Sequence, residues 1–505
     1  MLKSAIVLFI CTIVSKILGF VRELVVAYKF GAGEITDAFV TTNRVPTILF
    51  SALSVAISIN FIPVLVGITG GKKEQEKFAS NLINMSVLLM SVGIVLILCF
   101  PDAVLMIFAS GLKGKAYLYA VKMLRITAFS VVPIVLSQIF QSYMQTKDRF
   151  LSTGLTGIVC NIVVILFAFV TTEETYQLLS VGTLVSNLVM MIFMIMELKR
   201  TRFHYDFVLN IRDKNLKLLI LLTLPLIVET LTSELNAIVD SNMASRLDSG
   251  TITSLSYANN LVKMANVMIA TTIITIVFPK FSKYFAKKNM ESLKKEFTYY
   301  GDILAMALIP LSIIMIVLSE PIINFLFLRG EFDQQAAVIT KESMIWYAIG
   351  IFPLGMKAYV IRMFYAFKDT KTPTKYAVVS LGVNIVLNFL LIVPLRHIGL
   401  ALSTSLASML SYMLLMKKLA PILHMNFLEQ IVKRNFKIIF ASTLSGGVIY
   451  LLYVSLLRNC GELWVLLSMG ILYIFVYMLV LYIMKYYLLS DILMMVRVKL
   501  INMKK

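Results

Sequence analysis

The sequence has few of the residues on which disulfide-bonded proteins and metalloenzymes depend. It contains only four cysteines and three histidines among 505 residues. Cys11, Cys99 and Cys160 fall inside apolar runs, so neither a disulfide framework nor a Cys/His metal site is expected. The chain also has no Gly-rich phosphate loop and no catalytic Cys/His pair. We therefore expect no enzyme activity and no organic cofactor.

Charged residues are scarce as well. They make up 15% of the chain, whereas hydrophobic residues make up 59%, and the mean hydropathy is +0.87. This balance excludes a soluble domain and indicates an all-α polytopic membrane protein. The net charge of +20 would by itself suggest nucleic acid. The basic residues lie in alternate loops between apolar runs, however, so we expect membrane lipids and no nucleic acid as partners.

Apolar runs of about 20 residues or more, the length that crosses a bilayer, recur along the chain. They predict about 14 transmembrane helices. The runs lie near residues 4–27, 35–68, 80–108, 118–145, 151–171, 176–198, 216–243, 251–279, 298–327, 335–366, 376–395, 398–417, 438–457 and 463–488. The first run has no small-residue cleavage site, which favours a retained helix over a removed signal peptide.

Lysine and arginine gather in every second loop, which predicts the orientation. Residues 72–77, 199–217 and 287–295 are rich in them, as is the C-terminal tail. The intervening loops hold stretches such as TTEET (171–175) and RGEFD (329–333). The positive-inside rule therefore predicts a multi-pass protein of the plasma membrane with both termini in the cytoplasm.

The sequence also repeats itself at a nearly constant offset. FIPVLVGITGGKKEQEKF (61–78) resembles VFPKFSKYFAKKNMESLKKEF (277–297), and CNIVVILF (160–167) resembles VNIVLNFLL (383–391). A parallel repeat of six helices predicts two pseudo-symmetric lobes and a substrate cleft between them, as in transporters that alternate access. The expected parts are a six-helix lobe at 1–214, a second at 215–418, and a linker with two appended helices at 419–505.

Ionisable residues interrupt the first two apolar runs. Lys16, Arg22, Asp37 and Arg44 stand among apolar neighbours, where each costs about 2.5–3.5 kcal/mol at the bilayer centre. Such residues are kept where they face a water-filled cavity or bind a charged group; internal pairing or snorkelling to the membrane edge is the alternative. A cleft lined by cations suits an anionic substrate, and the planar arginine fork matches phosphate oxygens.

A second group of ionisable residues lies in the seventh and eighth runs. Glu229 and Asp240 are three helical turns apart and share one face, whereas Glu234 points elsewhere. Two interpretations remain open for them. They form a cation or proton site, or they pair with Lys263 or another cation.

Residues 12–46 carry a family resemblance. SKILGFVRE, FGAGEITDAF and NRVP resemble the first two helices of the MurJ/MviN family of lipid II flippases, part of the multidrug/oligosaccharidyl-lipid/polysaccharide exporter superfamily. The resemblance runs, more weakly, to about residue 420. It implies a flippase that moves a polyprenyl-diphosphate-linked glycan, with lipid II as the first candidate, from the inner to the outer leaflet by alternating access. Cell-wall synthesis enzymes would then be candidate protein partners.

The resemblance also implies where the substrate binds. Arg22, Arg44, Lys16 and Lys263 would hold the diphosphate, and Asp37 would orient or neutralise a neighbouring cation. These five residues form the predicted substrate site.

A sodium site is implied as well. VDSNMAS resembles the family's seventh helix, so Asp240 would be one ligand, and Asn384, Asn388 and Thr404 would match the polar residues of helices eleven and twelve. Asn384 and Asn388 are one turn apart, and their carbonyl oxygens would suit a hard cation such as Na⁺. The family can have Asp where Asn388 stands. The alternative interpretation is an asparagine pair that simply joins transmembrane helices.

The chain departs from the family at several positions. Phe50 and Val55 stand where the family has a basic residue and a glutamate, and Asn260 stands where it has an arginine. These departures leave open a flippase for another lipid-linked polysaccharide unit. A cation-coupled multidrug antiporter is the alternative from a different class, favoured by the acidic residues of the seventh run. A membrane scaffold for envelope enzymes would leave the charges within the helices unexplained.

Overall fold

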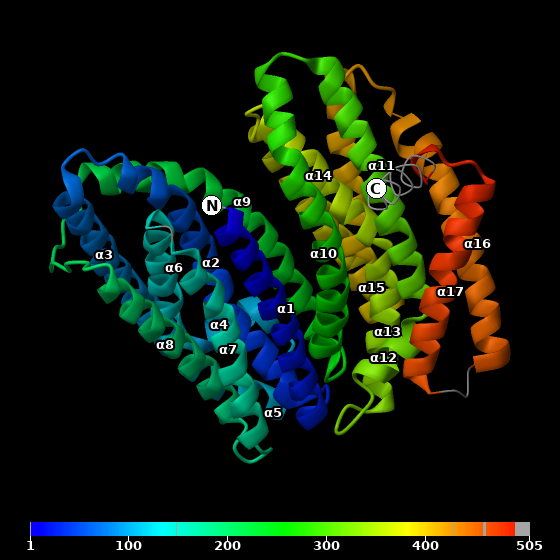
Figure 1. The fold of residues 1–505 in the computed structure, drawn as a ribbon. Helices are drawn as coiled ribbons and strands as arrows, with labels where there is room; N and C mark the ends of the chain where they lie inside the picture. The colour runs from blue at the N-terminus through cyan, green and yellow to red at the C-terminus, as the bar shows by residue number, and fades with distance from the viewer. Residues whose placement is uncertain (1, 148, 428, 458–460, 490–505) are drawn as a thin grey trace, which may run out of the picture. The chain divides into compact units, whose positions relative to one another are not determined.

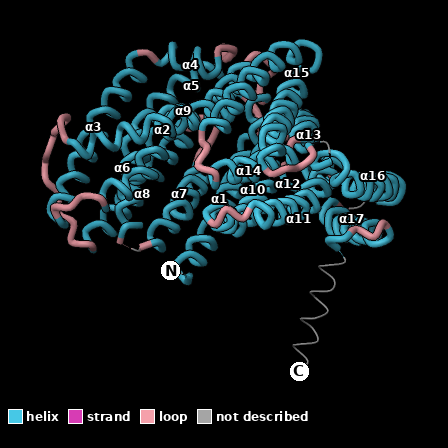
Figure 2. The backbone as a smooth tube through the Cα atoms, turned by 90° about the horizontal axis from the view of Figure 1, so that it is seen from above, coloured by secondary structure: helices cyan, strands magenta, loops and turns pink. Residues whose placement is uncertain are grey.

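The computed structural model describes residues 2–147, 149–427, 429–457 and 461–489. Helices make up most of these residues, and no strand occurs among them (Figure 2). Eight of the described helices are long and apolar enough to cross a membrane, and one bent pair raises the number to nine. The prediction of an all-α polytopic membrane protein is confirmed.

The predicted apolar runs correspond to the observed helices, several of which are broken. The first half of the chain contains α1 (Leu2–Phe30), α2 (Glu34–Val66), α3 (Gly71–Cys99), α4 (Pro101–Ala109), α5 (Gly114–Thr127), η1 (Ala128–Ser130), α6 (Val131–Thr146), α7 (Phe150–Val170) and α8 (Gln177–Arg200). The second half contains α9 (Lys214–Ala244), α10 (Thr251–Ala286), α11 (Met290–Val317), α12 (Ser319–Leu326), α13 (Gln334–Ile349), α14 (Ile351–Ala366), α15 (Lys371–Ile422), η2 (Glu429–Lys433), α16 (Arg434–Leu452), η3 (Tyr453–Leu457) and α17 (Glu462–Ile483).

Proline explains two of the breaks. Pro101 is the first residue of α4, so the run predicted at 80–108 is divided between α3 and α4. Within α15, Arg396 has a left-handed φ of 51°, two residues after Pro394. Because proline has no amide hydrogen, it interrupts the helical ladder. The two runs predicted at 376–395 and 398–417 are therefore the two arms of α15.

Packing divides the chain into two compact units. The first unit contains residues 1–253 and 329–336, and the second contains residues 254–328 and 337–505. Helix α9 belongs to the first unit because it packs against α2 and α4. The boundaries taken from the internal repeat follow sequence similarity, a different criterion, and stay predictions.

In the first unit, α1 packs along α7 and α7 along α8, while α2 contacts α5, α6 and α9 (Figure 1). Two apolar clusters fill the interior. One joins α2, α3, α6 and α8 around Phe61, Phe78 and Tyr143, and the other surrounds Phe108 and Met123. Helix α2 contributes to both clusters, so its position determines where Asp37 and Arg44 lie.

In the second unit, α14 packs against α11 and α15, and the last two helices attach to α11 and α12. Pro310 inside α11 has no N–H to offer the carbonyl of Met306, and the Tyr477 hydroxyl donates to that oxygen at 3.0 Å instead. Tyr473 donates similarly to the carbonyl of Pro310, also at 3.0 Å. Helix α17 is thus attached where the ladder of α11 is weakened.

Candidate functional site

The predicted cations of the first unit lie on α1 and α2. Lys16 is exposed, and Arg22 and Arg44 are partly exposed. The Arg22 guanidinium lies 3.9 Å from the Glu23 carboxylate, and 38% of its side chain is accessible. All three cations therefore have some accessible surface, as contact with an anionic ligand requires.

Small and polar residues fix α1 on α7. A Cβ atom on Gly157 would lie only 2.2 Å from the Ser15 hydroxyl, so glycine is needed for the approach. The Asn161 amide donates to the backbone oxygen of Ser15 at 3.0 Å and to that of Gly157 at 2.8 Å. These contacts hold in place the part of α1 that carries Lys16 and Arg22.

Asp37 is buried and accepts three hydrogen bonds at the start of α10. One carboxylate oxygen accepts from the Gly250 amide at 2.7 Å, and the other accepts from the Thr253 amide at 2.8 Å and the Thr253 hydroxyl at 2.6 Å. A carboxylate at a helix N-terminus satisfies amides that have no partner within the helix and complements its dipole. From the sequence we expect Asp37 beside a cation; the structure gives it these partners, all in the first unit.

Backbone segments meet closely around Asp37. The Glu331 amide donates to the carbonyl of Tyr28 at 2.9 Å. Gly330 has a φ of 63°, and a Cβ atom there would lie 2.1 Å from the same Tyr28 oxygen. Gly250 has a φ of 85°, and its Cβ would lie 2.3 Å from the Ala32 oxygen. We call this junction of residues 28–37, 250–253 and 330–331 the α1–α2 corner. In the sequence this corner is marked only by a glycine next to an acidic residue, as in Gly33–Glu34 and Gly330–Glu331.

Three of the four predicted sodium ligands come together in the second unit. The Asn388 amide donates to the Asn384 side-chain oxygen at 3.0 Å, and the Asn384 amide donates to the Thr404 hydroxyl at 3.4 Å. Ser403, which the sequence did not predict although it adjoins Thr404, donates to the Asn388 oxygen. Both asparagines are buried. The group consists of neutral side chains that carry oxygen atoms, and its hydrogen bonds join the two arms of α15.

The fourth predicted ligand, Asp240, lies on α9 in the first unit. It is partly buried and accepts from the Asn236 amide at 3.2 Å. Among the described residues, no group of three or more His, Cys, Asp or Glu side chains is arranged for a metal ion. Glu234 is partly buried, and the side chain of Glu229 lies outside the described residues.

Lys263 is exposed on α10, in the second unit. Lys357 of α14, in the same unit, is partly buried.

Two of the departures from the family pattern can be located. Phe50 packs with both apolar clusters of the first unit, and its ring lies where a Cβ on Gly93 would come within 2.6 Å. It is therefore a packing residue. Asn260 is partly buried on α10, and the side chain of Val55 lies outside the described residues.

Comparison with known proteins agrees with this architecture. The model of the family described as "Lipid II flippase MurJ" matches residues 26–475. The lipid II flippase MurJ of Thermosipho africanus is 28% identical over 428 residues, which cover 83% of this chain and 86% of the relative. The probable lipid II flippase MurJ of Rickettsia prowazekii is 26% identical over 417 residues, or 80% and 81% of the two chains.

Solved structures give the same result. A lipid II flippase MurJ in an inward closed conformation matches with a TM-score of 0.84 and 28% identity, covering 95% of this chain and 98% of that chain. An inward-facing multidrug resistance MATE family transporter of the MOP superfamily matches with a TM-score of 0.72 over 81% of this chain and 94% of that chain. Its identity of 14% shows the fold alone. The family model covers most of the chain, and the protein therefore belongs to the lipid II flippase MurJ family.

Proposed function

We propose that this protein moves lipid II from the inner to the outer leaflet of the plasma membrane, with both termini in the cytoplasm and without catalysing a reaction. The observation that carries the proposal is the family match over residues 26–475. The accessible cations on α1 and α2 suit the diphosphate that joins the glycan to its polyprenyl chain.

In this proposal four basic side chains hold the diphosphate. Arg22 and Arg44 supply planar forks for phosphate oxygens, and Lys16 and Lys263 add point charges. The polyprenyl chain stays in the lipid, since its transfer to water would expose a long apolar surface.

Alternating access requires contacts that form in one state and break in another. The α1–α2 corner supplies such contacts in this proposal, because Asp37 and Tyr28 hydrogen-bond to the start of α10 and to the 330–331 turn. Asp37 in this proposal is a gate residue, and it acts on the cations only indirectly.

A sodium ion is the proposed coupling ion, bound by Asp240 with Asn384, Asn388 and Thr404. The supporting observation is that the last three residues already form one hydrogen-bonded group. Sodium would replace the hydrogen bonds between them with ion–oxygen contacts, which requires both asparagines to turn their oxygens to one point.

Complementation tests the substrate. Expression of this protein in a bacterium depleted of its lipid II flippase is expected to restore growth. Phe50, which packs in place of the family's basic residue, favours a second candidate, a flippase for another lipid-linked polysaccharide unit. Failure of a well-expressed, membrane-inserted protein to rescue growth would favour that second candidate and would contradict the assignment of lipid II.

A further inference from the structure

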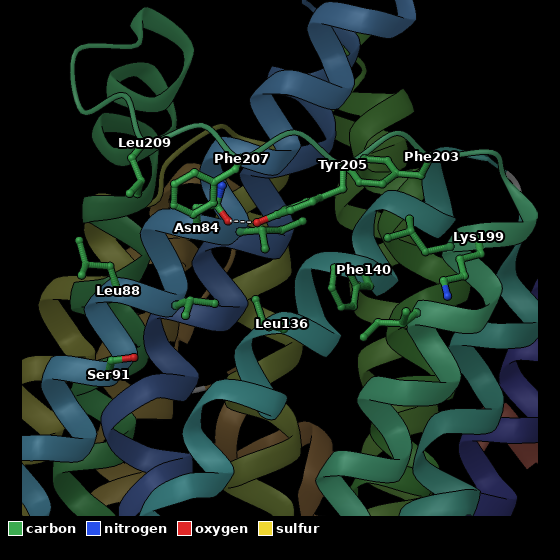
Figure 3. Close-up of a pocket in the computed structure, with 14 residues that line it drawn as sticks. Asn84, Leu88, Ser91, Leu136, Phe140, Lys199, Phe203, Tyr205, Phe207 and Leu209 are labelled. Atoms are coloured by element: carbon green, nitrogen blue, oxygen red, sulfur yellow. Dashed lines mark hydrogen bonds between the residues drawn. The ribbon is translucent and has the colours of Figure 1, made fainter.

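The first unit contains a cavity of 660 Å³ that includes none of the predicted substrate or sodium residues (Figure 3). It lies between α3, α6, α8 and the segment that follows α8. Its volume is in the range of about 300–1,000 Å³ typical of ligand pockets. The lining is mainly apolar and consists of Ile83, Asn84, Val87, Leu88, Ser91, Leu136, Phe140, Ile195, Leu198, Lys199, Phe203, Tyr205, Phe207 and Leu209. A ligand that fits it must be mostly hydrocarbon.

One wall of the cavity is an extended segment of alternating character. Phe203, Tyr205, Phe207 and Leu209 all line the cavity, and the residues between them do not. In an extended chain successive side chains point to opposite sides, so this alternation places one apolar side of the segment against the cavity. The pattern F-x-Y-x-F-x-L is the sequence signal of this wall.

Polar side chains of α3 hold the segment in place. Asn81 and Asn210 exchange two hydrogen bonds, of 3.0 and 2.8 Å. The Asn84 amide donates to the Val208 carbonyl at 3.0 Å, and the Tyr205 hydroxyl donates to the Asn84 oxygen. The cavity is thus bounded on this side by a fixed wall, in which Asn84 and Tyr205 have hydrogen-bond partners.

The rim of the cavity is apolar and exposed. Leu88 is 53% exposed, Leu209 is 49% exposed and Phe207 is 78% exposed there. Exposed apolar surface of this kind marks a site of contact with lipid or another apolar partner. The predicted topology places the start of α3 and the end of α8 at the cytoplasmic surface, so the cavity lies at the level of the inner leaflet.

One charged residue lines the cavity. Figure 3 shows Lys199 and Phe140 at one end and Leu88, Ser91 and Leu209 at the other. Among the described residues, Lys199 takes part in no ion pair, and the neighbouring Glu197 carboxylate is bound by Arg149 and Arg200. The lysine therefore offers its charge to a ligand whose apolar part occupies the cavity.

We propose that this cavity binds an anionic phospholipid of the cytoplasmic leaflet, with one acyl chain among Leu88, Leu136 and Phe140 and the headgroup phosphate at Lys199. Basic pockets between helices on the cytoplasmic side suit phosphate-bearing headgroups, and aromatic residues such as Tyr205 prefer the membrane interface. The inference stands on the first unit alone and holds whichever glycan the protein carries.

The test measures lipid binding to the purified full-length protein by native mass spectrometry. The two probes are dioleoyl phosphatidylglycerol and dioleoyl phosphatidylcholine, which share their chains and differ in net charge. We expect tighter binding of phosphatidylglycerol, a preference that Lys199→Gln lowers about fivefold. Lys77→Gln makes the same charge change at an exposed position of α3 outside the cavity and should leave the preference unchanged.

A second pair of variants tests the chain site. Ser91→Trp puts an indole into the cavity and should weaken binding of both lipids, whereas Val95→Trp, one turn further along α3 and exposed, should not. Leu88→Trp, which fills the rim of the cavity, replaces Ser91→Trp in this test if Ser91→Trp lowers the melting temperature of the protein. Equal effects of Lys199→Gln and Lys77→Gln, or full lipid binding after filling, would overturn the proposal. Displacement of phosphatidylglycerol by equimolar undecaprenyl phosphate would also overturn it, because the occupant would then be a polyprenyl lipid.

Discussion

Asp37 and Thr253 are 216 positions apart in the chain and are joined by two hydrogen bonds to one carboxylate oxygen, at 2.8 Å from the Thr253 amide and 2.6 Å from its hydroxyl. The contact links the beginning of α2 to the beginning of α10. An acidic side chain is unfavourable within a membrane helix, but here it is stabilised because it caps the N-terminus of α10. One side chain of the α1–α2 corner, Asp37, therefore contributes both to the stability of the first unit and to the proposed gate.

Asp37→Ala removes three acceptor contacts and leaves the amides of Gly250 and Thr253 unsatisfied. Hydrogen bonds to a charged group contribute about 1.5–3 kcal/mol, so we expect a loss of about 2–3 kcal/mol and a lower melting temperature. Thr253→Val deletes only the hydroxyl and should cost about 1 kcal/mol. Thermal unfolding of the detergent-solubilised variants measures both. Equal melting temperatures for wild type and Asp37→Ala would refute the cap.

Gly330→Ala should separate the 330–331 turn from Tyr28. Its left-handed φ disfavours alanine, and the new Cβ would lie 2.1 Å from a backbone oxygen, so the backbone must move. Gly382→Ala is the matched control, since nothing lies within 4 Å of a Cβ placed there. We expect Gly330→Ala to reduce flippase activity and Gly382→Ala to preserve it. Full activity of Gly330→Ala would show that this contact is dispensable.

Arg44→Ala should abolish transport, whereas Arg44→Lys should keep a part of it, because lysine retains the charge but loses the fork. Arg125→Ala, an exposed arginine on α5, is the control and should be active. Complementation with expression checked by immunoblot is the measurement. An active Arg44→Ala protein would exclude this residue from the substrate site.

Asn388→Asp should strengthen the response to sodium, since it adds a carboxylate to a group of neutral oxygens. Asp240→Asn should weaken the response, and Asn187→Ala, an asparagine of α8 outside the group, should not change it. Transport in vesicles with and without a sodium gradient distinguishes these results. A rate that is independent of sodium in every variant would rule out sodium coupling.

Hydropathy predicted the helices well because the bilayer imposes a length on each span. Even the break at Arg396 falls between the two runs predicted at 376–395 and 398–417. The pairing of Asn384 with Asn388 was predictable from a spacing of one helical turn. Local periodicity carries this information, and the structure agrees with it.

The long-range contacts were not predictable from one sequence. Nothing local indicates that Asp37 binds Thr253, because this contact depends on how separate helices pack. The cavity was also missed. Its alternating wall from Phe203 to Leu209 is readable as an extended segment, but an extended segment between two membrane helices indicates a cavity only once α3 is placed beside it.

The central claim is that the protein carries lipid II across the membrane, and the exposure of lipid II at the outer leaflet measures it directly. In cells depleted of their own flippase, outer-leaflet lipid II is quantified with an impermeant reagent after expression of this protein. The account predicts that wild type restores exposure and that Arg44→Ala does not, at equal membrane levels. Lipid II that stays on the inner leaflet despite abundant wild-type protein would contradict the account.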